Sequence, residues 1–113
     1  MADQRTTAHD RCRDLPGAVL TNPFPSPVDV FKVAGKVFAL ISTDDEPGRL
    51  TLKCDPNLGE SLRAEHPAIV PGYHMNKRHW ITIALDGSVP DGLIGDLLQD
   101  AYDLVAPRRR RLG

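Results

Sequence analysis

Hydrophobic residues alternate with polar ones in the middle of the chain and recur every three or four residues near both ends. Residues 28–33 and 36–42 are rich in β-branched and aromatic side chains. They are separated by Ala34-Gly35, and this spacing predicts a β-hairpin. Residues 49–54 alternate as a third strand, with the apolar side chains on one face. Three consecutive antiparallel strands are therefore predicted.

Two more strands are predicted further along the chain. A strand-like run begins near Ile69, bends at Pro71-Gly72 and resumes over residues 79–85. The bend is expected because glycine gives the backbone freedom to turn directly after a proline. The sequence thus predicts an antiparallel five-stranded sheet.

Helical spacing marks three segments. Residues 3–14 are predicted to form a helix, because Ala8, Cys12 and Leu15 recur at positions i, i+4 and i+7. Asp55-Pro56 predicts the start of a second helix, because Asp is a favourable N-cap and Pro fits the first helical position. Ser88-Val89-Pro90-Asp91 has the form of a capping box and predicts the start of a last helix, whose apolar positions from Leu93 to Val105 show the clearest helical periodicity before Pro107 ends it. The order α-β-β-β-α-β-β-α predicts an α+β two-layer sandwich with the helices packed on one face of the sheet.

The length of 113 residues predicts one domain, assigned to residues 1–107, followed by a flexible basic tail over residues 108–113. The charges nearly cancel, with 14 basic residues against 15 acidic ones. This balance is unusual for a dedicated nucleic-acid binder but leaves room for a local basic face. Arg108 to Arg111 could contact phosphate or simply keep the terminus soluble, and the sequence leaves both open.

Location is predicted from what the chain contains. The first 14 residues are polar, and no apolar run approaches the ~20 residues that span a bilayer. Cys12 and Cys54 fall in separate elements, as expected of reduced thiols. We therefore predict a cytoplasmic protein that does not contact a membrane, with a monomer favoured.

The last strand gives the first candidate for chemistry. If its isoleucines meet the helices, Trp80 lies on the open face of the sheet, and the same alternation places Arg49 and Lys53 there. A tryptophan among cations is what a surface that stacks bases and binds phosphates needs. In the alternative interpretation, Trp80 packs beneath the proline-rich residues 21–27 and the cations are ordinary solvated side chains.

The segment before this strand also admits two interpretations. Tyr73, His74 and Asn76 could satisfy backbone groups within a hydrogen-bonded bend, or they could face a ligand. Lys77 and Arg78 would then add positive charge beside them.

The sequence supports metal binding and catalysis less well than it supports a ligand-binding surface. His74 and His79 are five residues apart, a spacing that does not bring two ligands together on a strand or a helix. Cys54 is the one candidate nucleophile, but its alternation with leucines places it in the core. We predict no metal, no cofactor and no catalytic residue.

Several short motifs together resemble one family. They are Pro23-Phe24, Val30-Phe31-Lys32-Val33, Gly35-Lys36-Val37-Phe38-Ala39, Lys53-Cys54-Asp55-Pro56, Pro71-Gly72-Tyr73-His74-Met75-Asn76-Lys77, His79-Trp80 and Tyr102. In combination they resemble the small bacterial MmcQ/YjbR family. The chain differs in having Pro25 where glycine is common after Pro-Phe, and Ala101 where serine is common before the tyrosine.

The resemblance implies a compact sandwich like that of frataxin (CyaY-like) and of secretion chaperones. It also implies DNA binding. On this basis Lys53, His74, Asn76, Lys77, His79 and Trp80 are carried over as candidate ligand-contacting residues. A protein-interaction or chaperone-like domain is the main alternative, because the net charge is near zero. A small-ligand sensor or enzyme is the second alternative.

Overall fold

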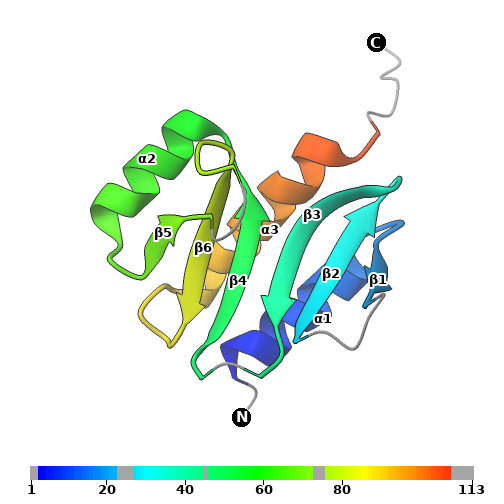
Figure 1. Ribbon diagram of the computed structural model, residues 1–113, viewed down its shortest axis with the longest axis horizontal. Coiled ribbons are helices and arrows are strands. Elements are labelled where there is room, and N and C mark those ends of the chain that lie inside the picture. The colour runs from blue at the N-terminus through cyan, green and yellow to red at the C-terminus, as the bar shows by residue number, and fades with distance from the viewer. Residues whose placement is uncertain (1–2, 23–26, 45, 73–75, 108–113) are drawn as a thin grey trace.

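Six antiparallel strands form one open sheet in the order β1–β2–β3–β4–β6–β5 (Figure 1). The structure is a computed structural model and describes residues 3–22, 27–44, 46–72 and 76–107. Its elements are α1 (Gln4–Asp14), β1 (Val19–Thr21), β2 (Val28–Val33), β3 (Lys36–Ser42), β4 (Gly48–Lys53), α2 (Pro56–Glu65), β5 (Ile69–Pro71), β6 (Trp80–Leu85) and α3 (Asp91–Val105). The predicted α+β class is confirmed. The predicted tail over residues 108–113 lies outside the described residues.

The predicted count of five strands is wrong by one. The additional strand, β1, lies at the edge of the sheet and pairs with β2, with Val19 opposite Lys32. It is only three residues long, and both Val19 and Leu20 are exposed. So short a segment shows no alternation in the sequence, and its last residue, Thr21, belongs to the proline-rich stretch 21–27.

The starts of α1 and α2 follow from their capping residues, whereas the capping box predicted at Ser88 does not form, because α3 has Pro90 as its N-cap and no side-chain capping hydrogen bond. The Asp3 carboxylate accepts a hydrogen bond from the Thr6 backbone N–H at 2.8 Å. The Asp55 carboxylate does the same for Asn57, at 2.9 Å, and Pro56 occupies the first turn of α2. Both N-termini therefore lie within one residue of where the sequence predicts them.

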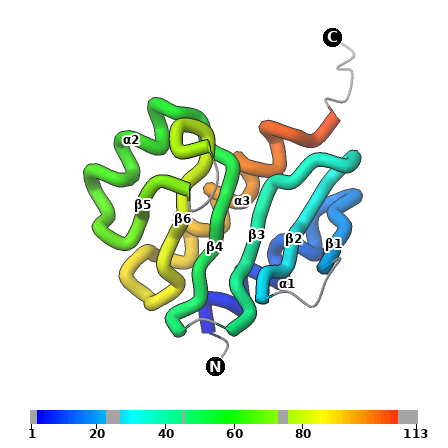
Figure 2. Tube along the Cα trace, in the orientation of Figure 1, coloured from blue at the N-terminus to red at the C-terminus, as the bar shows by residue number. Residues whose placement is uncertain are grey.

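The hydrophobic core lies between the sheet and the helices. α1 and α3 cross behind the sheet in the view of Figure 2, and α2 packs near the β5–β6 end, where Gly59 lies beside Ile81. The fully buried side chains that fill this layer include Phe31, Phe38, Ile41, Leu50, Leu52, Ile81, Ile83 and Leu98.

A β-bulge joins the middle of the sheet to α3. Phe31 pairs with Ala39 while Lys32 pairs with Val37, so Phe38 is the extra residue on β3. Its ring turns toward α3 and meets Tyr102 edge to face at 5.6 Å. The Tyr102 hydroxyl donates a hydrogen bond to the Pro16 carbonyl, which ties α3 to the segment after α1. Beyond this region β3 and β4 diverge (Figure 2).

Candidate functional site: the helix-free face of the sheet

The strand register places the predicted cations and the tryptophan on one face of the sheet. Lys53 pairs with Trp80, Thr51 with Thr82, and Arg49 with Ala84 across β4 and β6. Ile81 and Ile83 face the helices, as the alternation predicted. We call the opposite side the helix-free face, because no helix among the described residues packs on it. It is formed by Val19, Thr21, Val28, Val30, Lys32, Val37, Leu40, Ser42, Arg49, Thr51, Lys53, Val70, Trp80, Thr82 and Ala84.

Trp80 is held between its two neighbouring strands. The Lys53 ammonium lies 5.4 Å from the centre of the indole ring, within the range of a cation–π contact. On the other side, the Gly72 backbone N–H donates a 2.8 Å hydrogen bond to the Trp80 carbonyl. A Cβ atom at position 72 would collide with the Trp80 Cβ, so only glycine fits this approach.

The prediction of an exposed stacking ring is therefore corrected. Trp80 lies on the predicted face but is only 8% exposed, so a base cannot stack on it in this conformation. The alternative interpretation, in which residues 21–27 pack over Trp80, does not hold for the described ends of that segment. Thr21 and Pro27 lie at the β1–β2 edge, with β3 and β4 between them and Trp80. Trp80 instead positions Lys53.

In the turn before β6, Asn76 forms hydrogen bonds within the turn, and the three residues after it expose their side chains. The Asn76 side-chain oxygen accepts from the Arg78 backbone N–H at 2.9 Å, and its carbonyl accepts from His79 at 3.2 Å. The His79 carbonyl accepts in turn from the Cys54 N–H at 2.8 Å, which places this turn beside the end of β4. The side chains of Lys77, Arg78 and His79 are exposed. Asn76 thus shapes the turn, while its neighbours present charge. Tyr73 and His74 lie outside the described residues.

The strand positions of the helix-free face carry positive charge and no acid. Asp29 is the only acidic residue within the six strands, and its side chain points to α1 rather than to the helix-free face. The strand positions of that face carry Lys32, Arg49 and Lys53. Most acidic residues lie on the helices and turns instead, including Asp91, Asp96, Asp100 and Asp103 on α3. The near-neutral net charge therefore conceals a positively charged sheet face.

Neither cysteine is placed for nucleophilic chemistry. Burial is the main cause of a raised pKa for the Cys54 thiol, and nearby Asp55 and Asp100 raise that pKa further. Burial also raises the pKa of Cys12, to about 12. Within the described ranges no group of three His, Cys, Asp or Glu side chains is gathered as a metal site would require.

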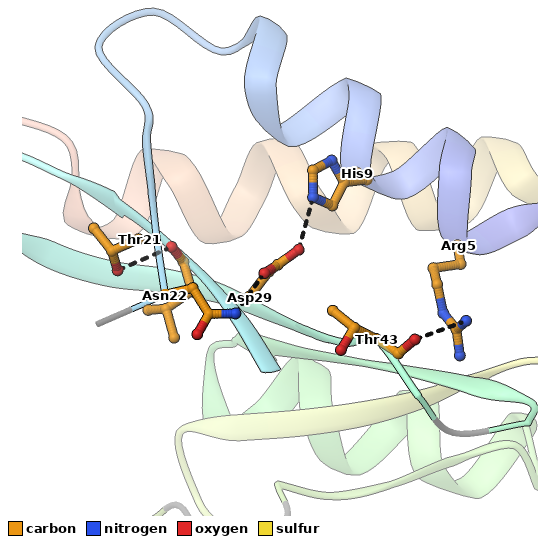
Figure 3. Close-up of polar contacts among 7 residues, drawn as sticks. Arg5, His9, Thr21, Asn22, Asp29 and Thr43 are labelled. Atoms are coloured by element: carbon orange, nitrogen blue, oxygen red, sulfur yellow. Dashed lines mark hydrogen bonds and ion pairs between the residues drawn. The ribbon is translucent and has the colours of Figure 1, made fainter. Parts of the chain in front are cut away.

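A hollow of about 230 Å³ lies on the other side of the molecule, between α1 and the ends of β2 and β3. His9 Nε2 lies 3.0 Å from Asp29 Oδ2, and the Asn22 amide donates to Asp29 Oδ1 at 3.0 Å. In Figure 3 His9 and Arg5 both extend from α1 toward the strands, His9 to Asp29 and Arg5 to the Thr43 carbonyl, to which it donates at 3.5 Å. The hollow is lined by Arg5, Thr6, His9, Asp10, Asp29, Ile41, Ser42 and Thr43.

Sequence reasoning missed this second group. His9 and Asp29 are 20 residues apart and in different elements, so no local motif joins them. One signal was present: Arg5 and His9 are four residues apart on a predicted helix and therefore share a side of it. In the structure the mixed charges of this group are largely used to tie α1 to the sheet.

Comparison with known proteins agrees with this architecture. The model of the YjbR family matches residues 13–104, so the chain belongs to the YjbR family. It is 38% identical over 99 residues to the uncharacterized protein YbdF of Escherichia coli O157:H7, covering 88% of this chain and 81% of that protein. It is 34% identical to the uncharacterized protein YjbR of Escherichia coli K12, covering 89% of both.

A solved structure extends the comparison to the fold. The crystal structure of Deinococcus radiodurans protein DR2400, which carries a DUF419 domain, superposes with a TM-score of 0.82 at 46% identity. The match covers 86% of this chain and 74% of that one. Separately, within the part of the chain that the structure describes, none of the helices is both long and apolar enough to cross a membrane.

Proposed function

We propose that this protein binds DNA through the helix-free face of its sheet and the adjoining turn at residues 76–79. The observation that carries the proposal is the charge of this face: Lys32, Arg49 and Lys53 occupy it, and its strand positions include no acid. Phosphate contacts by Lys and Arg supply most of the affinity of non-specific DNA binding. A face of this sign therefore suits the phosphate backbone.

The individual residues have distinct roles in the proposal. Lys53 and Arg49 contact phosphates from β4, and Lys77 and Arg78 contact them from the turn beside it. Trp80 fixes the position of Lys53 through the cation–π contact and does not itself stack on a base. The proposed activity is binding without catalysis.

The test is a titration of fluorescently labelled DNA at salt concentrations from about 50 mM to about 200 mM. We expect binding at the lower concentration, with a steep loss of affinity as salt rises. The variant Arg49→Glu/Lys53→Glu should abolish binding. The matched control is Arg11→Glu/Arg13→Glu, which makes the same change in net charge on α1, at two exposed positions away from this face. It should bind nearly as the wild type does.

Two results would overturn the proposal. One is the absence of binding to any DNA near 50 mM salt, where phosphate contacts are strong. The other is equal weakening by both double variants, because that would reflect overall charge and not this face. The alternative of a protein-interaction domain is favoured by the exposed Val19 and Val70 on the same face, at 56% and 45% exposed. It predicts binding to an acidic protein and none to DNA.

A further inference from the structure

We infer that the nucleic acid lies on the helix-free face as an unpaired strand and not as a duplex. This inference rests on the proposed function and specifies the substrate class of that same face. It comes from the apolar side chains that lie between the cations.

The centre of the face is aliphatic. One row of paired residues crosses all six strands: Thr21, Val30, Leu40, Thr51, Thr82 and Val70. The only polar groups in this row are the threonine hydroxyls, and those of Thr51 and Thr82 are 2.9 Å apart and bonded to each other. Val28 continues the apolar surface in the next row. Thr51 and Thr82 are buried, whereas Val70 is exposed and Val28, Val30 and Leu40 are partly exposed, so a ligand on this face meets mainly hydrocarbon.

The cations surround this aliphatic centre. Lys32 is on β2 and Lys53 is on β4, with β3 between them, and both lie toward the end of the sheet where β3 and β4 are no longer paired. Arg49 is four residues from Lys53 along β4, which corresponds to roughly 13 Å. Phosphates held at these positions leave the groups between them directly above Val30 and Leu40.

The two forms of nucleic acid meet such a face differently. A duplex presents charged phosphates and sugars on its outside, and its base edges are reached only by an element that enters a groove. A six-stranded sheet is too wide to enter a groove, so a duplex would press a hydrated backbone against hydrocarbon and lose water from charged groups. An unpaired strand can turn the apolar faces of its bases onto the sheet while its phosphates reach the cations.

A second copy of the same face is a poor occupant. Face-to-face pairing would bring Lys32, Arg49 and Lys53 of one copy against the same cations of the other, and the strand positions of the face hold no acid to compensate. An anionic partner with apolar groups of its own satisfies both features of the face.

The experiment compares three polyanions at one low salt concentration: a labelled single-stranded oligonucleotide of mixed sequence, its duplex of the same length, and inorganic polyphosphate as an unlabelled competitor. We expect the affinity for the single strand to exceed the affinity for the duplex by about tenfold or more. Polyphosphate should compete weakly, because it has charge but no bases.

Two variants test the aliphatic centre. Leu40→Gln and, at the more exposed position, Val70→Gln should each weaken single-strand binding several-fold and leave polyphosphate binding unchanged. The control is Leu104→Gln, the same kind of change at a 50% exposed position on α3, and it should have no effect. Melting temperatures show whether each variant folds, and Val70→Gln keeps the test valid if Leu40→Gln does not.

The outcomes separate this inference from the proposed function. If the duplex binds as tightly as the single strand, the inference is wrong while DNA binding by this face stands. The same conclusion follows if Val70→Gln does not weaken binding of the single strand. If no polyanion binds, the proposed function fails as well. Binding of an acidic protein together with no nucleic acid would also overturn both.

Discussion

Lys53 and Trp80 face each other across the β4–β6 pair, with the ammonium 5.4 Å from the centre of the indole ring. The ring is 8% exposed, and the lysine side chain is only partly buried. The buried Trp80 ring therefore holds the Lys53 side chain in place, while the Lys53 ammonium group can still reach a ligand. Because Trp80 is the only tryptophan, its fluorescence reports on this contact alone.

We expect the fluorescence of Trp80 to be weakly quenched by acrylamide in the wild-type protein, because little of the ring is accessible. Lys53→Ala should increase the quenching by removing the side chain that lies over the ring. Lys36→Ala, at an exposed position at the start of β3, is the control and should leave the quenching unchanged. Strong quenching of the wild type would show that the ring is open to solvent and would restore the prediction of a stacking surface.

Gly72 should tolerate no side chain. A Cβ there would meet the Trp80 Cβ and backbone, and neither can move without disturbing the β5–β6 pairing. We expect Gly72→Ala to lower the free energy of unfolding by about 1–3 kcal/mol, the usual cost of overpacking. Chemical denaturation measures this.

The control for that experiment is a glycine with space around it. Gly92 lies near the start of α3, and a Cβ there would have no neighbour within 4 Å. Gly92→Ala should raise stability by up to about 1 kcal/mol, because alanine favours the helix. If both variants lose stability equally, the close approach of Gly72 to Trp80 is not the cause.

Local signals in the sequence predicted most of this fold, and long-range packing explains what they missed. Asp55-Pro56 marks a helix start through its own side chains, and Ala34-Gly35 marks a hairpin through its own backbone. The strand alternation likewise placed Lys53 and Trp80 on one face. It could not predict how deeply Trp80 is buried, because burial depends on segments distant along the chain, among them Gly72, which follows β5 and lies against Trp80.

The same limit applies to the hollow beside α1. His9 also packs edge to face on Phe31, with ring centres 5.0 Å apart, so its surroundings come from β2 as much as from its own helix. The contact exists only after the helix has folded back onto the sheet. Sequence spacing carries no signal for it.

The hairpin between β2 and β3 contains a residue that can be improved. Ala34 has a φ of 52°, in the left-handed region, followed by Gly35 at 79°. This two-residue turn favours Asn at its first position, and a left-handed alanine costs roughly 1 kcal/mol. We expect Ala34→Asn to raise the melting temperature. Gly35→Ala should lower it, although nothing lies within 4 Å of a Cβ there, because the strain is in the backbone. No change in either variant would contradict a left-handed turn.

The acidic side of α3 should weaken the fold at neutral pH. Burial, followed by the neighbouring Asp103 and Asp96, raises the pKa of Asp100 above its ordinary value of 3.8. A carboxyl group with a raised pKa in the folded state stabilises the fold while protonated, and that advantage is lost as the pH rises through the folded-state pKa. We therefore expect Asp100→Asn to raise the melting temperature at neutral pH and to have little effect below pH 3.8.

The pKa of Asp86 is shifted in the opposite direction to that of Asp100, and its effect is also measured by the melting temperature. Hydrogen bonds from the Ser88 hydroxyl and backbone N–H, at 2.6 and 2.9 Å, lower the pKa of Asp86 below 3.8. Its charged form stabilises the fold above that value, and this contribution is lost as the pH falls through the lowered pKa. Asp86→Asn should therefore lower the melting temperature at neutral pH. Because the two variants remove the same charge, shifts of the same sign would mean that net charge, and not the surroundings of each carboxylate, controls stability.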